Sequence, residues 1–184
     1  CKNNYVVTNA IGHILMQKMP EEINEQYKEW RLEDLPLQVR PIPLKVKPQT
    51  AEQFKVVQGL LAQADTVINA GDPDDEGQLL VDEIIEFCQF KGVQQRLLVN
   101  DLKVESAKKA LANIEPNSKY LGMRNKALAR SQAAYIVGLN LTRAYPIFAR
   151  QKGVKSALTE GRVQTPPLAL IVHRFLQNPD NNNT

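Results

Sequence analysis

A β-branched segment that turns directly into an amphipathic helix is the feature that most constrains how this chain can fold. Residues 66–71 read TVINAG, and from about residue 76 the apolar side chains recur at helical spacing. RLLVN at 96–100 predicts another short strand, and 104–114 predicts another helix. Strands that alternate with helices at these lengths indicate a parallel α/β sheet flanked by helices.

The segments on either side of this unit are less regular. NYVVTNAIGHIL at 4–15 is expected to be a strand already under way, without a preceding strand to pair with it. Residues 19–50 contain five prolines and many charges, so they predict loops and short extended pieces. A helix is expected over 51–64, because its apolar residues have helical spacing.

The second half of the chain has a different character. Residues 121–150 carry a helical signal only, with an interruption near Pro146, and a further helix should open at Pro166 and Pro167. The last residues, QNPDNNNT, predict disorder. We therefore expect an α/β domain over 1–117, an all-helical segment over 118–176 and a disordered tail over 177–184.

The charges are divided between these parts. The net charge is +3, but residues 1–118 hold 13 Lys and Arg against 18 acids, whereas residues 119–174 hold 10 against one. A segment with a balance of +9 indicates an anion-binding surface, most often for nucleic acid, although a merely solvated basic surface is an equal alternative.

Cysteine content and hydropathy indicate the compartment. The two cysteines, Cys1 and Cys88, make neither a disulfide framework nor a metal site. No apolar run reaches the length of a membrane span, and no signal peptide opens the sequence. The sequence thus predicts a cytoplasmic protein without a membrane partner.

Four carboxylates, Asp72, Asp74, Asp75 and Glu76, crowd into five residues where the strand becomes a helix. Like charges at this spacing repel, so solvent, a helix N-terminus or a metal ion must offset the cost. Ligands of open α/β sheets bind at the carboxyl ends of strands, where Asp72 is expected. An Asp-x-Asp-x-Glu pattern there suits Mg²⁺, which prefers hard oxygen ligands and holds phosphate oxygens.

Two other interpretations of the acids remain open. The first is an acidic turn in which one carboxylate caps the helix. The second is a calcium loop, because Asp72, Asp74, Glu76, Gly77 and Glu83 fall at loop positions 1, 3, 5, 6 and 12. A calcium loop should follow a helix, however, whereas TVINAG predicts a strand.

The sequence AGDPDDEGQLLVDEI resembles the acidic motif of the Toprim domain in type IA DNA topoisomerases, above all in their bacterial topoisomerase III group. Four more segments resemble that family in the same order: VVTNAIGHIL, YKEWRLEDLPL, ALARSQAAYIVGLNLTRAY and LTEGRVQTPPLALIV. The resemblance covers about residues 5–174. It implies a Toprim-like domain that lacks its first strand, followed by the start of the helical DNA-binding domain.

The resemblance also implies a mechanism, in which a tyrosine cleaves one DNA strand through a 5′ phosphotyrosine and a second strand passes through the gap. By this resemblance Asp72 and Asp74 are Mg²⁺ ligands and Glu76 is a supporting catalytic acid. The expected partner is single-stranded DNA, bound by a monomer. The residues implied in DNA binding are His13, Arg130, Arg143, Thr159, Glu160, Gly161, Arg162, Val163 and Gln164.

The sequence departs from the family pattern at several places. Tyr145 is followed by Pro146 and Ile147, not by the Pro-Arg setting of the family's nucleophile, and the family's opening Glu-Lys-Pro-Ser segment is not found. The 184 residues alone are therefore not expected to cleave DNA. Asp75 stands where the family has Arg, which should weaken phosphate binding, and Ala134 stands where it usually has Asp.

Two functional alternatives follow from these departures. One is a single-stranded DNA-binding module without catalysis. The other is a different Toprim enzyme, such as a primase or nuclease, which would keep the acids but would have no reason to carry EGRVQTP.

Overall fold

The structure is a computed structural model, and it describes residues 5–101, 103–153, 161 and 163–178. The chain divides into two compact units. The first unit comprises Cys1–Lys18 and Ile42–Arg130, and the second comprises Met19–Pro41 and Ser131–Thr184. These units follow packing and not family boundaries, so the predicted domain limits after residues 117 and 176 stay predictions.

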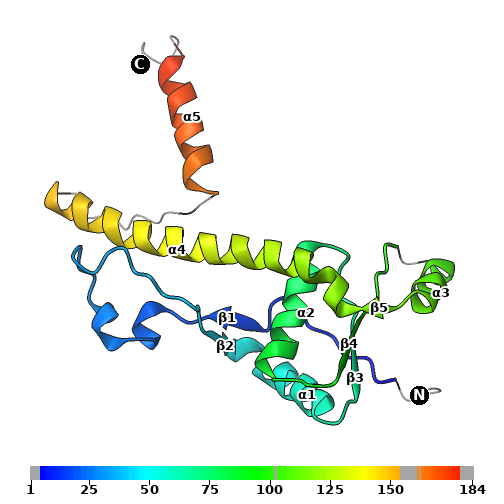
Figure 1. Ribbon diagram of the computed structural model, residues 1–184. Coiled ribbons are helices and arrows are strands. Elements are labelled where there is room, and N and C mark those ends of the chain that lie inside the picture. Colours follow the sequence, from blue (N-terminus) through cyan, green and yellow to red (C-terminus); the bar gives the residue numbers. More distant parts are fainter. Residues whose placement is uncertain (1–4, 102, 154–160, 162, 179–184) are drawn as a thin grey trace. The chain divides into compact units, whose positions relative to one another are not determined.

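A three-stranded sheet lies in the first unit, in the order β3 (Thr66–Asn69), β4 (Val93–Arg96) and β5 (Glu115–Pro116). β3 and β4 are parallel and are joined by helix α2 (Asp75–Phe87), which lies alongside them in Figure 1. This pair confirms the predicted α/β architecture. The sheet is mixed and not purely parallel, because β5 pairs antiparallel to β4.

The strand expected over 96–100 is placed differently. β4 covers Val93–Arg96, and the N–H of Leu97 donates the last hydrogen bond to the carbonyl of Asn69, at 2.9 Å. The last residue of the strand, Arg96, has its side chain in the interior, where it is 1% exposed. The true strand, VQQR, is mostly polar and gives a weak strand signal.

The strand expected over 4–15 is also shorter than predicted. The described part of this segment forms strand only from Leu15, in β1 (Leu15–Gln17), which pairs antiparallel with β2 (Leu44–Val46). Before β1 a side chain, and not a neighbouring strand, binds the backbone: the amide of Gln53 donates a hydrogen bond to the carbonyl of Asn9 at 2.6 Å. Val7 is 92% exposed, so no burial favours a strand at this point.

The apolar core of the first unit joins the small sheet to two helices. Its buried members are Ile14, Leu15, Phe54, Val57 and Ile84. They come from β1, from α1 (Ala51–Leu61) and from α2, so the predicted helix over 51–64 is confirmed with an earlier end. Burying each such side chain stabilises the fold by about 1.5–3 kcal/mol. This packing holds α2, and with it the acidic segment before it.

Most of the other described residues are helical or irregular, as predicted. Short helical turns η1 (Pro20–Glu22), η2 (Glu25–Lys28) and η3 (Pro48–Thr50) interrupt the proline-rich segment. Helix α3 (Val104–Ala112) follows β4, and η4 (Asn117–Tyr120) leads into α4. None of the described helices has both the length and the apolar character that crossing a membrane would require.

Helix α4 (Leu121–Gln151) continues through Pro146, so the predicted interruption there is wrong. A proline inside a helix removes one N–H donor at a cost of about 3 kcal/mol. Pro146 lies near the C-terminal end of the 31-residue helix, with 25 residues before it and five after it. The hydrogen bonds of the long part before it outweigh the local loss. Helix α5 (Thr165–Gln177) opens with the two prolines, as predicted. The tail after Asn178 lies outside the described residues.

Candidate functional site

The acidic loop begins where β3 ends and closes as α2 begins. Asp72 and Asp74 are exposed on this loop. The Oδ1 atom of Asp74 accepts a hydrogen bond of 2.7 Å from the backbone N–H of Gly77, so Asp74 is the N-cap of α2. The capping interpretation is therefore confirmed for Asp74. It does not exclude a metal, because the cap uses only one of the two carboxylate oxygens.

Two glycines allow the loop to lie directly against the first turn of α2. A Cβ on Gly77 would lie 2.5 Å from the carbonyl oxygen of Asp72 and 2.6 Å from its nitrogen. A Cβ on Gly71 would lie 2.5 Å from the carbonyl oxygen of Gly77. Because these contacts are with backbone atoms, no larger residue fits without moving the loop.

Arg96, the last residue of β4, holds the backbone of the acidic loop by hydrogen bonds. Its Nη1 atom donates to the backbone carbonyls of Asn69 at 3.1 Å and Gly71 at 2.8 Å, and its Nη2 atom donates to that of Asp72 at 2.6 Å. Burial lowers the pKa of Arg96, while the negative charge of Asp82 acts in the opposite direction. One guanidinium from β4 thus holds three carbonyls of the strand end and the loop.

The buried carboxylate of Asp82 connects β3, which leads into the loop, to α2 and η4. Asp82 is 6% exposed, and its Oδ1 atom accepts hydrogen bonds from Asn69 at 3.0 Å and Asn117 at 2.9 Å. Its Oδ2 atom accepts from the amide of Gln78 at 2.8 Å. The sequence analysis missed this network of β3, α2 and η4. The available signal was Gln78 and Asp82, which interrupt the apolar face of α2 four residues apart.

Cations from the start of α4 pair with the acids of α2 within the first unit. The Nζ atom of Lys126 lies 2.6 Å from the Oδ2 atom of Asp75. Arg130, one turn further along α4, forms a direct ion pair with Glu76. His13 contributes a third group, since its Nε2 atom lies 3.9 Å from Glu76 Oε2. Of the predicted DNA-binding residues, His13 and Arg130 are therefore brought to the same carboxylate.

The acids provide the ligand type that Mg²⁺ prefers but not a closed cage. Among the described residues, no three Asp, Glu, His or Cys side chains lie close enough together to hold a metal ion. Mg²⁺ in phosphate-binding sites often uses only one or two carboxylates and completes its shell with water and phosphate. The exposed pair Asp72 and Asp74 fits that mode, with Glu76 beside it.

The calcium-loop interpretation does not agree with this geometry. A calcium loop wraps around the ion through its twelfth position, which would be Glu83. Residues Asp75–Phe87 are already helical, so Glu83 lies within α2 and not on a loop. Burial raises the pKa of Glu83 to about 6; the nearby charge of Arg124 lowers it, and those of Glu76 and Glu86 raise it further.

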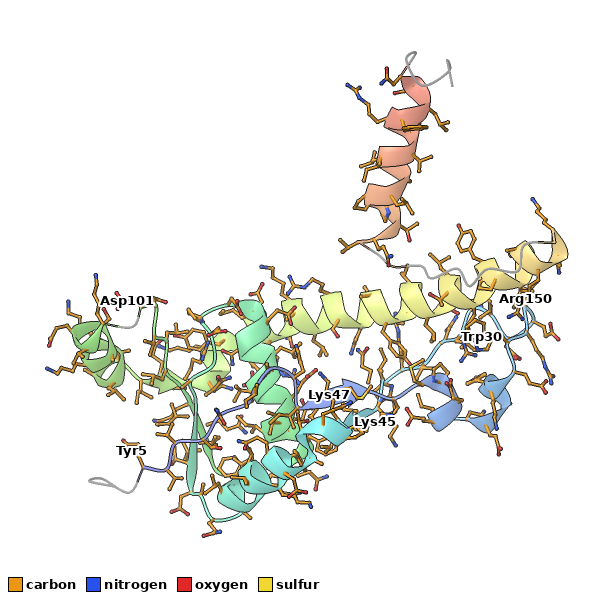
Figure 2. All side chains as sticks on the ribbon, turned by 180° about the vertical axis from the view of Figure 1, so that it is seen from behind. Tyr5, Trp30, Lys45, Lys47, Asp101 and Arg150 are labelled. Atoms are coloured by element: carbon orange, nitrogen blue, oxygen red, sulfur yellow. The ribbon has the colours of Figure 1, made fainter. Side chains whose placement is uncertain are left out.

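Arg143 is buried among partners of its own unit. It is 3% exposed, and it donates to the carbonyl of Tyr27 at 2.7 Å and to Glu21 Oε2 at 3.0 Å. Its guanidinium also lies 5.5 Å from the ring centroid of Trp30, a side chain that Figure 2 labels beside α4. In this arrangement Arg143 stabilises the second unit, and its role in DNA binding stays a prediction.

The predicted DNA-binding loop is only partly described. Thr159, Glu160 and Arg162 lie outside the described residues. Gly161 donates its N–H to Thr165 Oγ1 at 3.1 Å. Val163 is largely exposed, and Gln164 is the N-cap residue of α5.

The chain matches one protein family and several known proteins. The family model described as the Toprim domain matches residues 2–107. The chain is 42% identical to the DNA topoisomerase 3 of Vibrio cholerae over 178 residues, 95% of this chain and 28% of that protein.

Two further relatives extend the same picture. The DNA topoisomerase 3 of Haemophilus influenzae is 42% identical over 181 residues, 96% of this chain and 28% of that protein. That of Bacillus anthracis is 35% identical over 174 residues, 94% of this chain and 23% of that protein. The chain thus spans about a quarter of the length of these relatives. With the strand–acidic loop–helix unit at its centre and the family match over most of its length, this chain belongs to the Toprim domain family.

Proposed function

We propose that this chain is part of a type IA DNA topoisomerase, which relaxes and decatenates DNA through a transient single-strand break. One observation carries the proposal. The acidic loop is held rigidly at the carboxyl end of β3, in a chain that is 42% identical to a DNA topoisomerase 3 over nearly its whole length. The similarity continues past residue 107 into the helical segment, which favours a topoisomerase over a primase or nuclease.

The proposed roles follow from the loop. Asp72 and Asp74 hold Mg²⁺, and Glu76 is the supporting acid. Bound Mg²⁺ supplies positive charge that positions and neutralises DNA phosphate oxygens. Arg96 keeps the carbonyl of Asp72 in place, and the cap made by Asp74 fixes its side chain on the first turn of α2. Both contacts that hold the loop come from the protein itself.

The proposed DNA-binding surface takes single-stranded DNA. In the first unit, His13 and Arg130 lie beside Glu76. In the second unit, considered by itself, the proposed DNA contacts are Arg143 and residues 159–164. The excess of cations over residues 119–174 supports phosphate contacts along a backbone. None of the five tyrosines precedes Pro-Arg, so the proposal assigns no nucleophile within these residues. A cytoplasmic location and a monomeric state are further predictions.

A second candidate is a DNA-binding module without catalysis. Asp75 favours it, because an acid occupies the position of a family cation and already binds Lys126. Ala134 adds a second departure. In this case the chain binds single strands, but no strand is cut.

The two candidates are separated by relaxation of supercoiled plasmid by the full-length protein. We expect Mg²⁺-dependent relaxation that is lost in EDTA and in an Asp72→Asn, Asp74→Asn double variant. Glu52→Gln is the matched control, because Glu52 is an exposed acid on α1 that pairs only with Lys55 in the described contacts. Single-stranded DNA binding without relaxation, by a wild type that is folded, would support the non-catalytic module.

A further inference from the structure

The ion pair between Asp75 and Lys126 joins two very different environments. The Asp75 side chain is 18% exposed at the first residue of α2, whereas the Lys126 side chain is 72% exposed on α4. Their charged atoms are 2.6 Å apart. The carboxylate is therefore fixed in the protein, while the ammonium reaches it on a stem that is free to move in solvent.

Such an ammonium changes partner easily. Exposed ion pairs contribute little to stability, because water competes for both charges and the long side chain loses freedom. Asp75 keeps a second source of stabilisation when Lys126 leaves, since it lies at the positive end of the α2 dipole. The contact thus holds Lys126 only while no stronger anion is nearby.

The charges around the acidic loop determine when Lys126 leaves Asp75. Asp72, Asp74, Asp75 and Glu76 carry four negative charges, and Lys126 and Arg130 offset two of them. A divalent cation at Asp72 and Asp74 would offset the other two. A cation at that place would repel the Lys126 ammonium, because Lys126 pairs with Asp75, the residue next to Asp74. All four negative charges would then be offset, so the loop would no longer repel an added anion.

We propose that Lys126 is a metal-dependent phosphate contact, which Asp75 holds until a divalent cation binds the acidic loop and which then binds a DNA phosphate. This inference rests on the proposed function. It also gives a reason for the departure at position 75, because the cation that the family carries on α2 is supplied here from α4. Metal binding and DNA binding become coupled through one side chain.

The test measures binding of the full-length protein to a fluorescent single-stranded oligonucleotide, over a range of salt, in Mg²⁺ and in EDTA. Lys126→Ala should weaken binding about fivefold in Mg²⁺ and flatten the log–log salt dependence by about 0.7, the value for one phosphate contact. In EDTA it should change neither quantity. Lys119→Ala is the matched control, because Lys119 is also exposed and pairs with a different acid, Glu115.

A second variant tests the holding contact. Asp75→Asn removes the charge that retains Lys126, so binding in EDTA should strengthen towards the value in Mg²⁺. Calorimetry without DNA adds a readout of the metal itself, since Lys126→Ala removes a cation beside the loop and should tighten Mg²⁺ binding several-fold. Circular dichroism checks that each variant is folded.

Three results would overturn the inference. An equal loss for Lys126→Ala in Mg²⁺ and EDTA would make Lys126 an ordinary contact, and no loss in either would make it a solvated residue. An equal loss for Lys119→Ala would make the effect one of net charge. In all three cases the proposed function survives, whereas a wild type that does not bind single-stranded DNA at all would overturn both.

Discussion

The guanidinium of Arg96 donates a hydrogen bond of 2.6 Å to the backbone carbonyl of Asp72, the first acid of the loop. The same side chain is 1% exposed and reaches two more carbonyls, those of Asn69 and Gly71. A residue of the neighbouring strand therefore holds the backbone of the acidic loop. Its support can be removed without touching any carboxylate.

Replacing Arg96 should destabilise the protein strongly. Arg96→Ala removes the guanidinium donor from the carbonyls of Gly71 and Asp72, and truncating a buried charged partner costs about 3–5 kcal/mol. Chemical denaturation should show this loss of unfolding free energy. Arg31→Ala is the control, because Arg31 is exposed and its ion pair with Glu29 is screened by solvent, so stability should be nearly unchanged. A near-neutral Arg96→Ala would mean that the loop is held in another way.

The buried carboxylate of Asp82 gives a separate prediction. Asp82→Asn replaces an acceptor that receives three amide hydrogen bonds with a group that must itself donate. At least one amide then faces another amide hydrogen, at a cost of about 2–3 kcal/mol. Asp101→Asn is the control, since Asp101 is exposed. Equal thermal stability of Asp82→Asn and the wild type would contradict the network.

Gly77 and Gly59 form a matched pair of helical glycines. A Cβ on Gly77 would meet backbone atoms of Asp72 at 2.5–2.6 Å, whereas a Cβ on Gly59 has nothing within 4 Å. Gly77→Ala should therefore displace the acidic loop, lower stability by about 1–3 kcal/mol and weaken Mg²⁺ binding. Gly59→Ala should stabilise α1 by up to about 1 kcal/mol. If both variants are stabilised equally, the close approach of loop and helix is wrong.

Glu83 predicts how stability depends on pH. Its pKa is raised from 4.5 to about 6, first by burial, so between these values the folded protein keeps a proton that the unfolded chain has lost. Stability should therefore fall as pH rises through this window, by about 2 kcal/mol for the full shift and about 1 kcal/mol after allowance for solvent screening.

The variant Glu83→Gln isolates this effect. It should be about 1 kcal/mol more stable than the wild type at pH 7.5 and equal to it below pH 4.5. Urea denaturation at several pH values measures both. Glu52→Gln, an exposed acid on α1, should show no such dependence on pH. A constant difference between Glu83→Gln and the wild type would mean that Glu83 ionises normally.

The acidic loop was predictable from the sequence because its signals are local. The β-branched strand, the acid at the cap and the helical spacing all lie within about twenty consecutive residues, and each predicts the same structure. The start of α2 was therefore located to within one residue. The same locality explains why 51–64 and the helix opened by Pro166 were predicted.

The support beneath the loop was not predictable, because its partners are distant in the chain. Arg96 contacts residues 24 to 27 positions earlier, and Asn117 reaches Asp82 across 35 positions. Periodicity treats Gln78, Asp82 and Arg96 as polar surface residues, since it cannot show that amides and carbonyls from other elements meet them. The position of the polar strand VQQR was mispredicted for a related reason, because its pairing with β3, and not its composition, makes it a strand.

The last prediction concerns the charge at position 75. Asp75→Arg restores the family residue, but it places a cation at the positive end of α2 and directly opposite Lys126. The single variant should therefore lose about 1 kcal/mol of stability, and Lys126 should be expelled towards solvent. Removing Lys126 as well, in Asp75→Arg with Lys126→Ala, should recover about half of this loss.

The effect of Asp75→Arg on DNA binding should be opposite to its effect on stability: the variant should be less stable but should bind DNA more tightly. Asp75→Arg changes a repulsive charge beside the metal ligands into a phosphate partner, so single-stranded DNA should bind more tightly in Mg²⁺ and, without Asp75 to hold a cation, also in EDTA. The double variant should bind about as well as the wild type in Mg²⁺, because one cation has only moved from α4 to α2. If the double variant instead binds as weakly as Lys126→Ala, position 75 does not face DNA, and the departure from the family pattern has no bearing on the phosphate site.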